Sequence, residues 1–253
     1  MPFRKSIIFI ILSSLLFCNS SQKDAKIGIA FLEEGKQFTA YRFFEKALEN
    51  NKDEPLALYG KGKIFLRSSE TVQIGRELIR KSLPKLPEKH FNDAIKALVH
   101  SHTLAKEYRE SIALLQKQIE KKRESDLIYK NMVANYLILR KYEQGKRNLQ
   151  KALDLYPTSI HIMQIAGIYE SIVRKNKKEA LKYFEAVSKI DSKNSENLLN
   201  LAIVHNEMRN YKESVNTLIA LKSLSKPAKQ IEIESWIKLI SKKRWKKKIQ
   251  IHI

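Results

Sequence analysis

The sequence predicts an all-α fold made of repeated helical hairpins, and three observations support this prediction. The chain of 253 residues contains only 7 Gly and 6 Pro, too few for a fold with many tight β-turns. Leu, Ile, Lys, Glu and Ala dominate its composition, and most of these residue types favour helices. Bulky and small residues recur from residue 22 to residue 226, with a period of about 34 residues that is typical of a two-helix repeat.

The clearest repeat begins at Asp126 and ends at Pro157. Its apolar residues follow one another at steps of three and four, the spacing that places side chains on one face of a helix. Two such runs fit into the repeat, so we expect two helices joined by a short turn. The recurring positions are Tyr129, Met132, Val133 and Tyr136 in the first run, and Tyr142, Gly145, Leu149 and Ala152 in the second.

Five further stretches match this repeat, and small residues recur at two of its positions. Small residues let the paired helices approach closely, and Phe31, Phe44 and Phe184 are expected to fill the space between repeats. The second and fifth repeats each carry one additional residue. Lys61 stands where an apolar residue is usual, so we expect its stem to follow the core and its amine to stay in water. The small residues are Gly28, Gly62 and Gly167 in the first helices, and Ala40, Gly75, Ser111, Gly145, Ala180 and Ser214 in the second helices.

This pattern resembles the tetratricopeptide repeat. The resemblance implies a right-handed superhelical solenoid of about six helix-turn-helix units over residues 25–226. One hairpin cannot bury its own apolar face, so neighbouring units must stack. Residues 227–241 carry Ile233 and Trp236 on a further helical pattern, which we expect to cap the exposed end of the last unit.

The N-terminus has the pattern of a bacterial export signal. Arg4 and Lys5 precede an apolar run over residues 7–17, which is shorter than the roughly 20 residues of a spanning helix and predicts a signal peptide over residues 1–17. The only cysteine, Cys18, ends a stretch that resembles a lipobox, although Phe17 stands where that motif has a small residue. The resemblance implies a lipidated Cys18 with a polar tether over residues 18–24, and a location in the cell envelope at the periplasmic face of the outer membrane. An ordinary signal peptide or an uncleaved anchor with an incidental cysteine is the alternative.

The formal net charge of +21 predicts acidic partners, because such a surface attracts acidic proteins, anionic lipid or nucleic acid. A solvated, Lys-rich surface is the preferred interpretation of this charge, since the lysines are scattered along the chain. The basic tail over residues 242–253 contains Trp245 among six cations. It is expected either to contact anionic lipid or to form a frayed, solvated terminus.

The resemblance also implies a binding groove lined by the first helix of each repeat. We expect it to accept an acidic or amphipathic segment of another protein. Lys96 and Asn131 match two positions of a known carboxylate clamp, but His161 and Ile165 do not, so a solvated groove residue is the preferred interpretation of Lys96. The predicted groove residues are Tyr59, Lys63, Arg67, Lys96, His100, Lys130, Asn131, Ala134, Leu137, Gln164, Ile168, Leu199, Ile203 and Asn206.

No enzyme motif stands out in the sequence, which lacks a Gly-rich phosphate loop and the common hydrolase signatures. His100 and His102 are two residues apart on a predicted helix and point in different directions, so they predict no metal site. We therefore predict a membrane-anchored scaffold or adaptor without cofactors, which assists the assembly or localisation of an envelope complex. The alternatives are a nucleic-acid-binding helical repeat, which export would argue against, and a regulatory subunit of a cell-wall enzyme.

Overall fold

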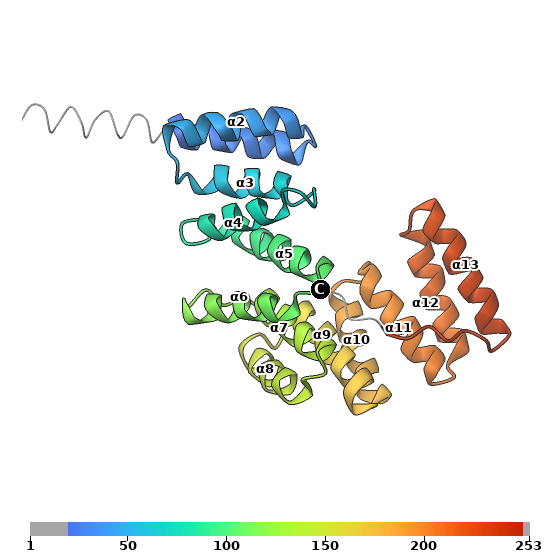
Figure 1. The fold of residues 1–253 in the computed structure, drawn as a ribbon. Helices are drawn as coiled ribbons and strands as arrows, with labels where there is room; N and C mark the ends of the chain where they lie inside the picture. The colour runs from blue at the N-terminus through green and yellow to red at the C-terminus, as the bar shows by residue number, and fades with distance from the viewer. Residues whose placement is uncertain (1–19, 250–253) are drawn as a thin grey trace, which may run out of the picture. The chain divides into compact units, whose positions relative to one another are not determined.

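The computed structural model describes residues 20–249, and this part of the chain is helical with no strand (Figure 1). The prediction of an all-α fold is therefore confirmed. Within residues 20–249, no helix is both long and apolar enough to cross a membrane. The predicted signal peptide and Cys18 lie outside the described residues.

The helices alternate with short turns in the order that the repeats predict (Figure 1). Residues 20–33 are helical and pair with the next helix, so they begin the first hairpin. The elements that follow are α2 (Gln37–Asn50), α3 (Pro55–Phe65), α4 (Val72–Ser82), α5 (Glu88–Leu104), α6 (Tyr108–Glu120), α7 (Asp126–Ile138), α8 (Tyr142–Leu155), α9 (Ile160–Tyr169), the π-helix η1 (Glu170–Arg174), α10 (Lys177–Ile190), α11 (Ser195–Glu207), α12 (Tyr211–Ser223) and α13 (Pro227–Ser241).

The chain divides into two compact units, an N-terminal unit that ends at Glu107 and a C-terminal unit that begins at Tyr108. The boundary falls within the third predicted repeat, whose first helix α5 belongs to one unit and whose second helix α6 belongs to the other. Within each unit, the second helix of one repeat packs against the first helix of the next, as α2 does on α3 and α10 on α11. The right-handed superhelix over the full array stays a prediction.

The polar tether predicted over residues 18–24 is corrected for residues 20–24, which are helical. Ser21 is fully buried, and its hydroxyl donates a hydrogen bond of 2.9 Å to the carbonyl oxygen of Ala47. The nearly buried Asp24 accepts a bond of 3.1 Å from the amine of Lys46. These polar side chains face α2 and complete the first hairpin, so their polarity does not indicate a solvated linker.

The small residues lie where helices or rings come closest together. A Cβ atom on Gly28 would lie 2.5 Å from the ring of Phe44, and one on Gly167 would lie 2.7 Å from the ring of Phe184. Both rings are fully buried. Small residues in first helices therefore make room for large side chains of second helices, as the repeat pattern predicts.

The two additional residues of the sequence are accommodated in different ways. In the second repeat, the additional residue lengthens the connection over residues 66–71, which consists of turns. The Thr71 hydroxyl donates a hydrogen bond of 2.8 Å to the carbonyl oxygen of Phe65. In the fifth repeat, α9 continues into η1, a π-helix that takes up one more residue without breaking the helix. The turn closes at Lys175, with a φ of 58°.

The sequence predicted the stem of Lys61 along the core and its amine in water, and the amine is instead held by neighbouring side chains. Its amine lies 5.4 Å from the ring centre of Tyr41 and 5.6 Å from that of Phe65. The amine is also paired with the carboxylate of Glu45 at 2.5 Å, and the side chain is only 18% exposed. The stem follows the core as expected, but the amine is held by an acidic partner and two rings.

The last helix, α13, packs against α12 and buries Ile233, Trp236 and Ile240. It ends in a Schellman motif, in which the amide of Lys243 donates to Ile240 and the amide of Arg244 donates to Leu239, both at 2.8 Å. Lys243 has the left-handed φ of 54° that this motif requires. The motif ends the helix at Ser241 and reverses the direction of the chain.

Candidate partner-binding surfaces

The N-terminal unit contains a cleft between its three first helices, which has a volume of about 300 Å³. Residues 20–33, α3 and α5 contribute its walls, so the cleft lies on the face where the sequence predicts a groove. Three of the predicted groove residues, Tyr59, Lys63 and Arg67, come together here. The lining residues are Ile29, Leu32, Glu33, Tyr59, Lys63, Arg67, Lys89, His90 and Asp93.

Asp93 organises the charged side of this cleft. The buried Tyr59 hydroxyl donates a hydrogen bond to its carboxylate, and the amine of Lys63 lies 2.7 Å from the same oxygen. Burial opposes ionisation of Asp93, but the bonds from Lys63 and Tyr59 outweigh it and hold the pKa of this carboxyl below its usual value. Burial, and then the bond to Asp93, raise the pKa of Tyr59 well above its usual value. Both residues are therefore fixed in one charge state at neutral pH.

Two acidic residues of the cleft, Glu33 and Asp93, are not among the predicted groove residues. Asp93 lies three residues before Lys96 on α5, a spacing that places residues on neighbouring parts of a helix surface. This register could have identified it as a groove residue. The predicted basic groove is therefore a surface of mixed charge in this unit, in which Asp93 already pairs with Lys63.

Lys96 and His100 lie further along α5 and are exposed, outside the residues that line the cleft. His102, two residues later, is buried and bonded through both ring nitrogens, with Nδ1 2.8 Å from Glu107 and Nε2 2.9 Å from Arg80. The Arg80 guanidinium can only donate, so Nε2 accepts and the ring is neutral. In the part of the chain that the structure describes, no three His, Cys, Asp or Glu side chains gather as metal ligands would.

The predicted groove residues of the C-terminal unit are more buried than a free groove allows. Asn131 and Leu137 on α7 and Gln164 on α9 are at most 3% exposed. The Gln164 amide donates a bond of 3.0 Å to Asn194 in the next repeat. These three side chains are therefore buried in this structure, whereas Lys130 and Asn206 are half-buried, and their role in a groove stays a prediction.

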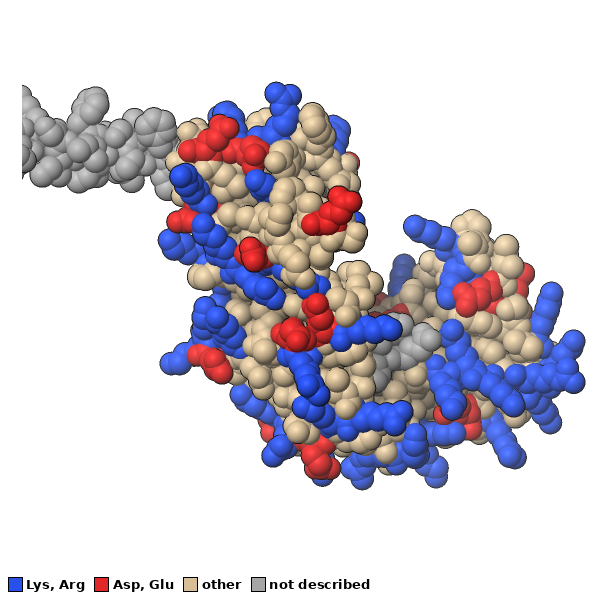
Figure 2. All heavy atoms as spheres, viewed as in Figure 1, with Lys and Arg blue, Asp and Glu red and all other residues tan. Residues whose placement is uncertain are grey.

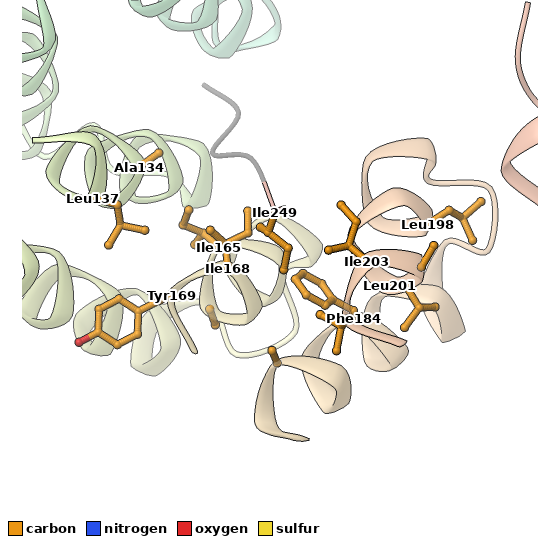
Figure 3. Close-up of a cluster of buried hydrophobic side chains, with 14 of the residues drawn as sticks. Ala134, Leu137, Ile165, Ile168, Tyr169, Phe184, Leu198, Leu201, Ile203 and Ile249 are labelled. Atoms are coloured by element: carbon orange, nitrogen blue, oxygen red, sulfur yellow. The ribbon is translucent and has the colours of Figure 1, made fainter. Parts of the chain in front are cut away.

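The C-terminal tail takes part in this burial, against both interpretations of Trp245. Trp245 is 5% exposed and Ile249 is 8% exposed, and both belong to the buried cluster to which the helices from α7 to α13 contribute. Figure 3 shows Ile249 beside Ile165 and Ile168 of α9 and close to Ile203 of α11. The described part of the tail therefore neither frays into solvent nor presents Trp245 to lipid.

Charged side chains are spread over the surface. On the face shown in Figure 2, Lys and Arg side chains cover parts of both units, and Asp and Glu side chains lie between them. Several cations of the described residues are paired, as in Lys81 with Asp53 at 2.7 Å and Lys222 with Glu234 at 2.5 Å. The high net charge thus arises from a general excess of cations over the surface.

No protein-family model and no curated protein matches the sequence. Several solved structures match the fold. One, from a functional characterisation of Pseudomonas aeruginosa pilF, is 18% identical, covers 86% of this chain and 97% of its own, and has a TM-score of 0.61. A tetratricopeptide repeat protein from Parabacteroides merdae is 16% identical, with coverage of 89% and 88% and a TM-score of 0.64.

A third structure is PilW, described as a widely conserved type IV pilus biogenesis factor. It is 14% identical, covers 84% of this chain and 98% of its own, and has a TM-score of 0.63. At these identities the likeness concerns the fold. Together with the helical hairpins inside the two units, such as α3 with α4 and α9 with α10, it shows that this chain has the fold of the tetratricopeptide-repeat proteins.

Proposed function

We propose that the protein is a non-enzymatic scaffold that binds other proteins, and that the cleft of the N-terminal unit is a principal contact site. The observation that carries this proposal is the convergence of Tyr59, Lys63 and Arg67 with residues of two other first helices around one cleft. Each of three repeats contributes one wall. A stretch of partner chain that crosses these helices would contact all three repeats at once.

The cleft favours a partner segment that is both apolar and acidic. Ile29 and Leu32 form an apolar wall, whereas Arg67 and Lys89 bring positive charge to the rim. The carboxylate of Asp93 is already used by Tyr59 and Lys63. An acidic partner side chain would therefore be attracted to Arg67 or Lys89, while its apolar neighbours cover Ile29 and Leu32.

We further propose that the scaffold works in the cell envelope, held to a membrane through a lipid on Cys18. The position of the only cysteine directly after a short apolar run supports this anchor. The likeness of this fold to that of PilW, a type IV pilus biogenesis factor, supports a role in the assembly of an envelope complex. A diacylated cysteine supplies two chains, which suffice for stable anchoring.

The binding role can be tested by charge reversal in the cleft. The double variant Arg67→Glu and Lys89→Glu should weaken partner binding about tenfold or more, because charge complementarity becomes repulsion. Cross-linking in isolated membranes, followed by mass spectrometry, identifies the partner. Its affinity is then measured with purified proteins.

A matched control comes from exposed lysines outside the cleft. Lys52→Glu and Lys85→Glu make the same change in net charge in the turns before α3 and α5. This control should bind the partner like the original chain. If both double variants lose binding equally, net charge rather than the cleft is responsible, and the cleft is not the contact site.

The anchor is tested separately by metabolic labelling with a fatty acid. The original chain should incorporate the label and sediment with membranes, and Cys18→Ala should do neither. Incorporation of label by Cys18→Ala would show that the lipid is attached at another residue, which would contradict the proposed anchor. The circular dichroism of the variant should be unchanged, because Cys18 precedes the described helices.

A further inference from the structure

The described end of the chain runs back over the first helices of the C-terminal unit. We name the surface formed by α7, α9 and α11 the first-helix face. After the Schellman motif at Lys243, residues 244–249 continue without helical or strand structure. The side-chain amide of Asn206 on α11 donates a bond of 3.1 Å to the carbonyl oxygen of Trp245. In a tetratricopeptide fold this surface is the one predicted to receive a partner, and Asn206 is a predicted groove residue.

The segment is held by two apolar side chains with solvated residues between them. Trp245 and Ile249 are buried, whereas Lys246 and Lys248 are exposed. The Trp245 ring packs against Trp236 of α13 with 5.9 Å between ring centres. Ile249 reaches the apolar side chains of α9 and α11 (Figure 3). Alternate side chains of an extended peptide point the same way, so residues 245 and 249 can contact one surface while Lys246 and Lys248 point to solvent.

The contact made by Trp245 leaves one polar group unsatisfied. Its indole N–H is buried and has no hydrogen-bond partner among the described residues. A buried unpaired donor lowers stability by about 1–3 kcal/mol. A different segment that offers an acceptor at this place, or lacks the N–H, would avoid that cost. The contact is therefore one that a competitor could improve.

We propose that the first-helix face of the C-terminal unit is a peptide-binding groove whose resident occupant is the chain's own segment 244–249, and that a partner segment with apolar anchors four residues apart must displace it to bind there. The inference rests on the proposed function only in treating a first-helix face as a peptide-binding surface. It concerns a different unit from the cleft around Asp93. The tail also acts as a local competitor, because its attachment to α13 keeps it at high effective concentration.

The docked state is tested in the full chain with Trp236→Phe, which leaves Trp245 as the only tryptophan and keeps a ring beside it. Quenching of Trp245 fluorescence by acrylamide, a neutral quencher, should be severalfold weaker than in a synthetic peptide of residues 242–253. The protection should not change when the protein is diluted. Quenching equal to that of the peptide would overturn the proposal, and protection that is lost on dilution would place the segment in the groove of a second copy instead.

The groove is tested with the same peptide as the probe, so no unidentified partner is needed. A chain that ends at Arg244 keeps the Schellman motif and lacks the anchors. It should bind the labelled peptide about a hundredfold more tightly than the full chain does, because the intact tail competes at millimolar effective concentration. A full-length Trp245→Ala, Ile249→Ala variant should behave like the shortened chain, which keeps the test valid if shortening impairs folding.

Two peptide variants serve as controls. The peptide with Trp245→Ala and Ile249→Ala should not bind, whereas the peptide with Lys246→Ala and Lys248→Ala should bind within about threefold, since exposed charges contribute little. Equal binding of the probe to full and shortened chains, or no binding to a shortened chain that retains its helical circular dichroism, would overturn the inference. Loss of partner binding in the N-terminal cleft would leave these results unchanged, so the two proposals fail separately.

Discussion

At the scale of single residues, the hairpin turns depend on basic residues in a strained conformation. The turn after residues 20–33 uses Gly35, with a φ of 79°, whereas equivalent turns use Lys106, Arg140 and Arg209 with φ between 57° and 64°. After Arg140, the backbone amide of Lys141 donates a hydrogen bond of 2.8 Å to the carbonyl oxygen of Tyr136, near the end of α7. A cation at this place also interacts favourably with the helix dipole, which offsets part of the strain.

Arg140→Gly should be more stable than Arg140→Ala, because both variants lack the cation and only glycine relieves the left-handed strain. Relief of the left-handed strain contributes about 1–2 kcal/mol, of which the flexibility of Gly in the unfolded chain removes about half, leaving roughly 0.5–1 kcal/mol. Urea unfolding followed by circular dichroism measures the change. Arg140→Ala is the control, because it removes the cation and keeps the strain, and a Gly variant no more stable than the Ala variant would contradict this explanation.

A second residue-scale feature is the buried polar network at the end of the N-terminal unit. The Arg76 guanidinium, 3% exposed, donates to the hydroxyl and carbonyl oxygens of Ser101 and lies 2.7 Å from Glu107. Burial lowers the pKa of His102 below its usual 6.5. The bond from His102, followed by the charge of Arg76, lowers the pKa of Glu107. Both groups therefore favour their deprotonated forms in the folded state.

This network should make the N-terminal unit lose stability as pH falls. Both folded pKa values lie below the unfolded ones, so the unfolded chain binds more protons, and stability decreases first as pH passes below 6.5 and again below 4.5. Urea midpoints measured from pH 7.5 down to acid values would show the decline. Glu107→Gln should flatten the lower part of the profile, whereas a midpoint that rises as pH falls would contradict the assignment.

At the scale of elements, the same repeat position imposes different demands in different hairpins. Gly75 and Gly145 both occupy the small-residue position of a second helix. A Cβ atom on Gly75 would lie 2.8 Å from the carbonyl oxygen of Gly62 and 2.9 Å from the amide of Leu66, both backbone atoms. On Gly145 the nearest atoms would lie 3.6 Å away, which is ordinary contact.

Alanine at these two positions should therefore have opposite effects. Gly75→Ala forces α3 and α4 apart and should destabilise the N-terminal unit by about 2 kcal/mol or more. Gly145→Ala fits without movement and should stabilise the C-terminal unit by up to about 1 kcal/mol through helix propensity. Thermal unfolding of both variants gives the comparison. Two changes of the same sign would show that the position, rather than the local spacing, governs the outcome.

At the scale of the whole molecule, the charge of +21 affects how partners approach more than how the chain folds. Several cations on the described surface have acidic neighbours, so the excess is spread out. Arg67 and Lys89 at the rim of the N-terminal cleft are where this charge would meet a partner directly. Long-range attraction of an acidic protein should then be followed by specific contacts in the cleft.

Binding of the partner identified by cross-linking should weaken as salt rises. Raising the ionic strength from about 0.1 M to 1 M shortens the Debye length from about 10 Å to 3 Å. Loss of about three exposed pairs of roughly 0.5 kcal/mol each would lower the affinity about tenfold. Titration calorimetry at several salt concentrations measures this, and an affinity indifferent to salt would mean that apolar contacts dominate the interface.

The sequence by itself determined the repeats, the order of the helices and the positions where they approach closely. These features depend on local periodicity and on residue size, as Gly28 opposite Phe44 illustrates. Even the additional residue of the fifth repeat was visible, although its form as the π-helix η1 was not, because a longer turn and a π-turn accommodate one residue equally well in a sequence.

Only the tertiary structure decided which polar and basic residues face the interior. Ser21 and Trp245 stand in stretches that look solvated, yet both are buried by residues distant along the chain, Ala47 in one case and the helices around Asn206 in the other. Asp93 likewise acquires its importance from Tyr59, a residue on another helix. Burial and ion pairing are properties of contacts between segments, and the helical period that identifies each segment carries no information about which distant segment covers it.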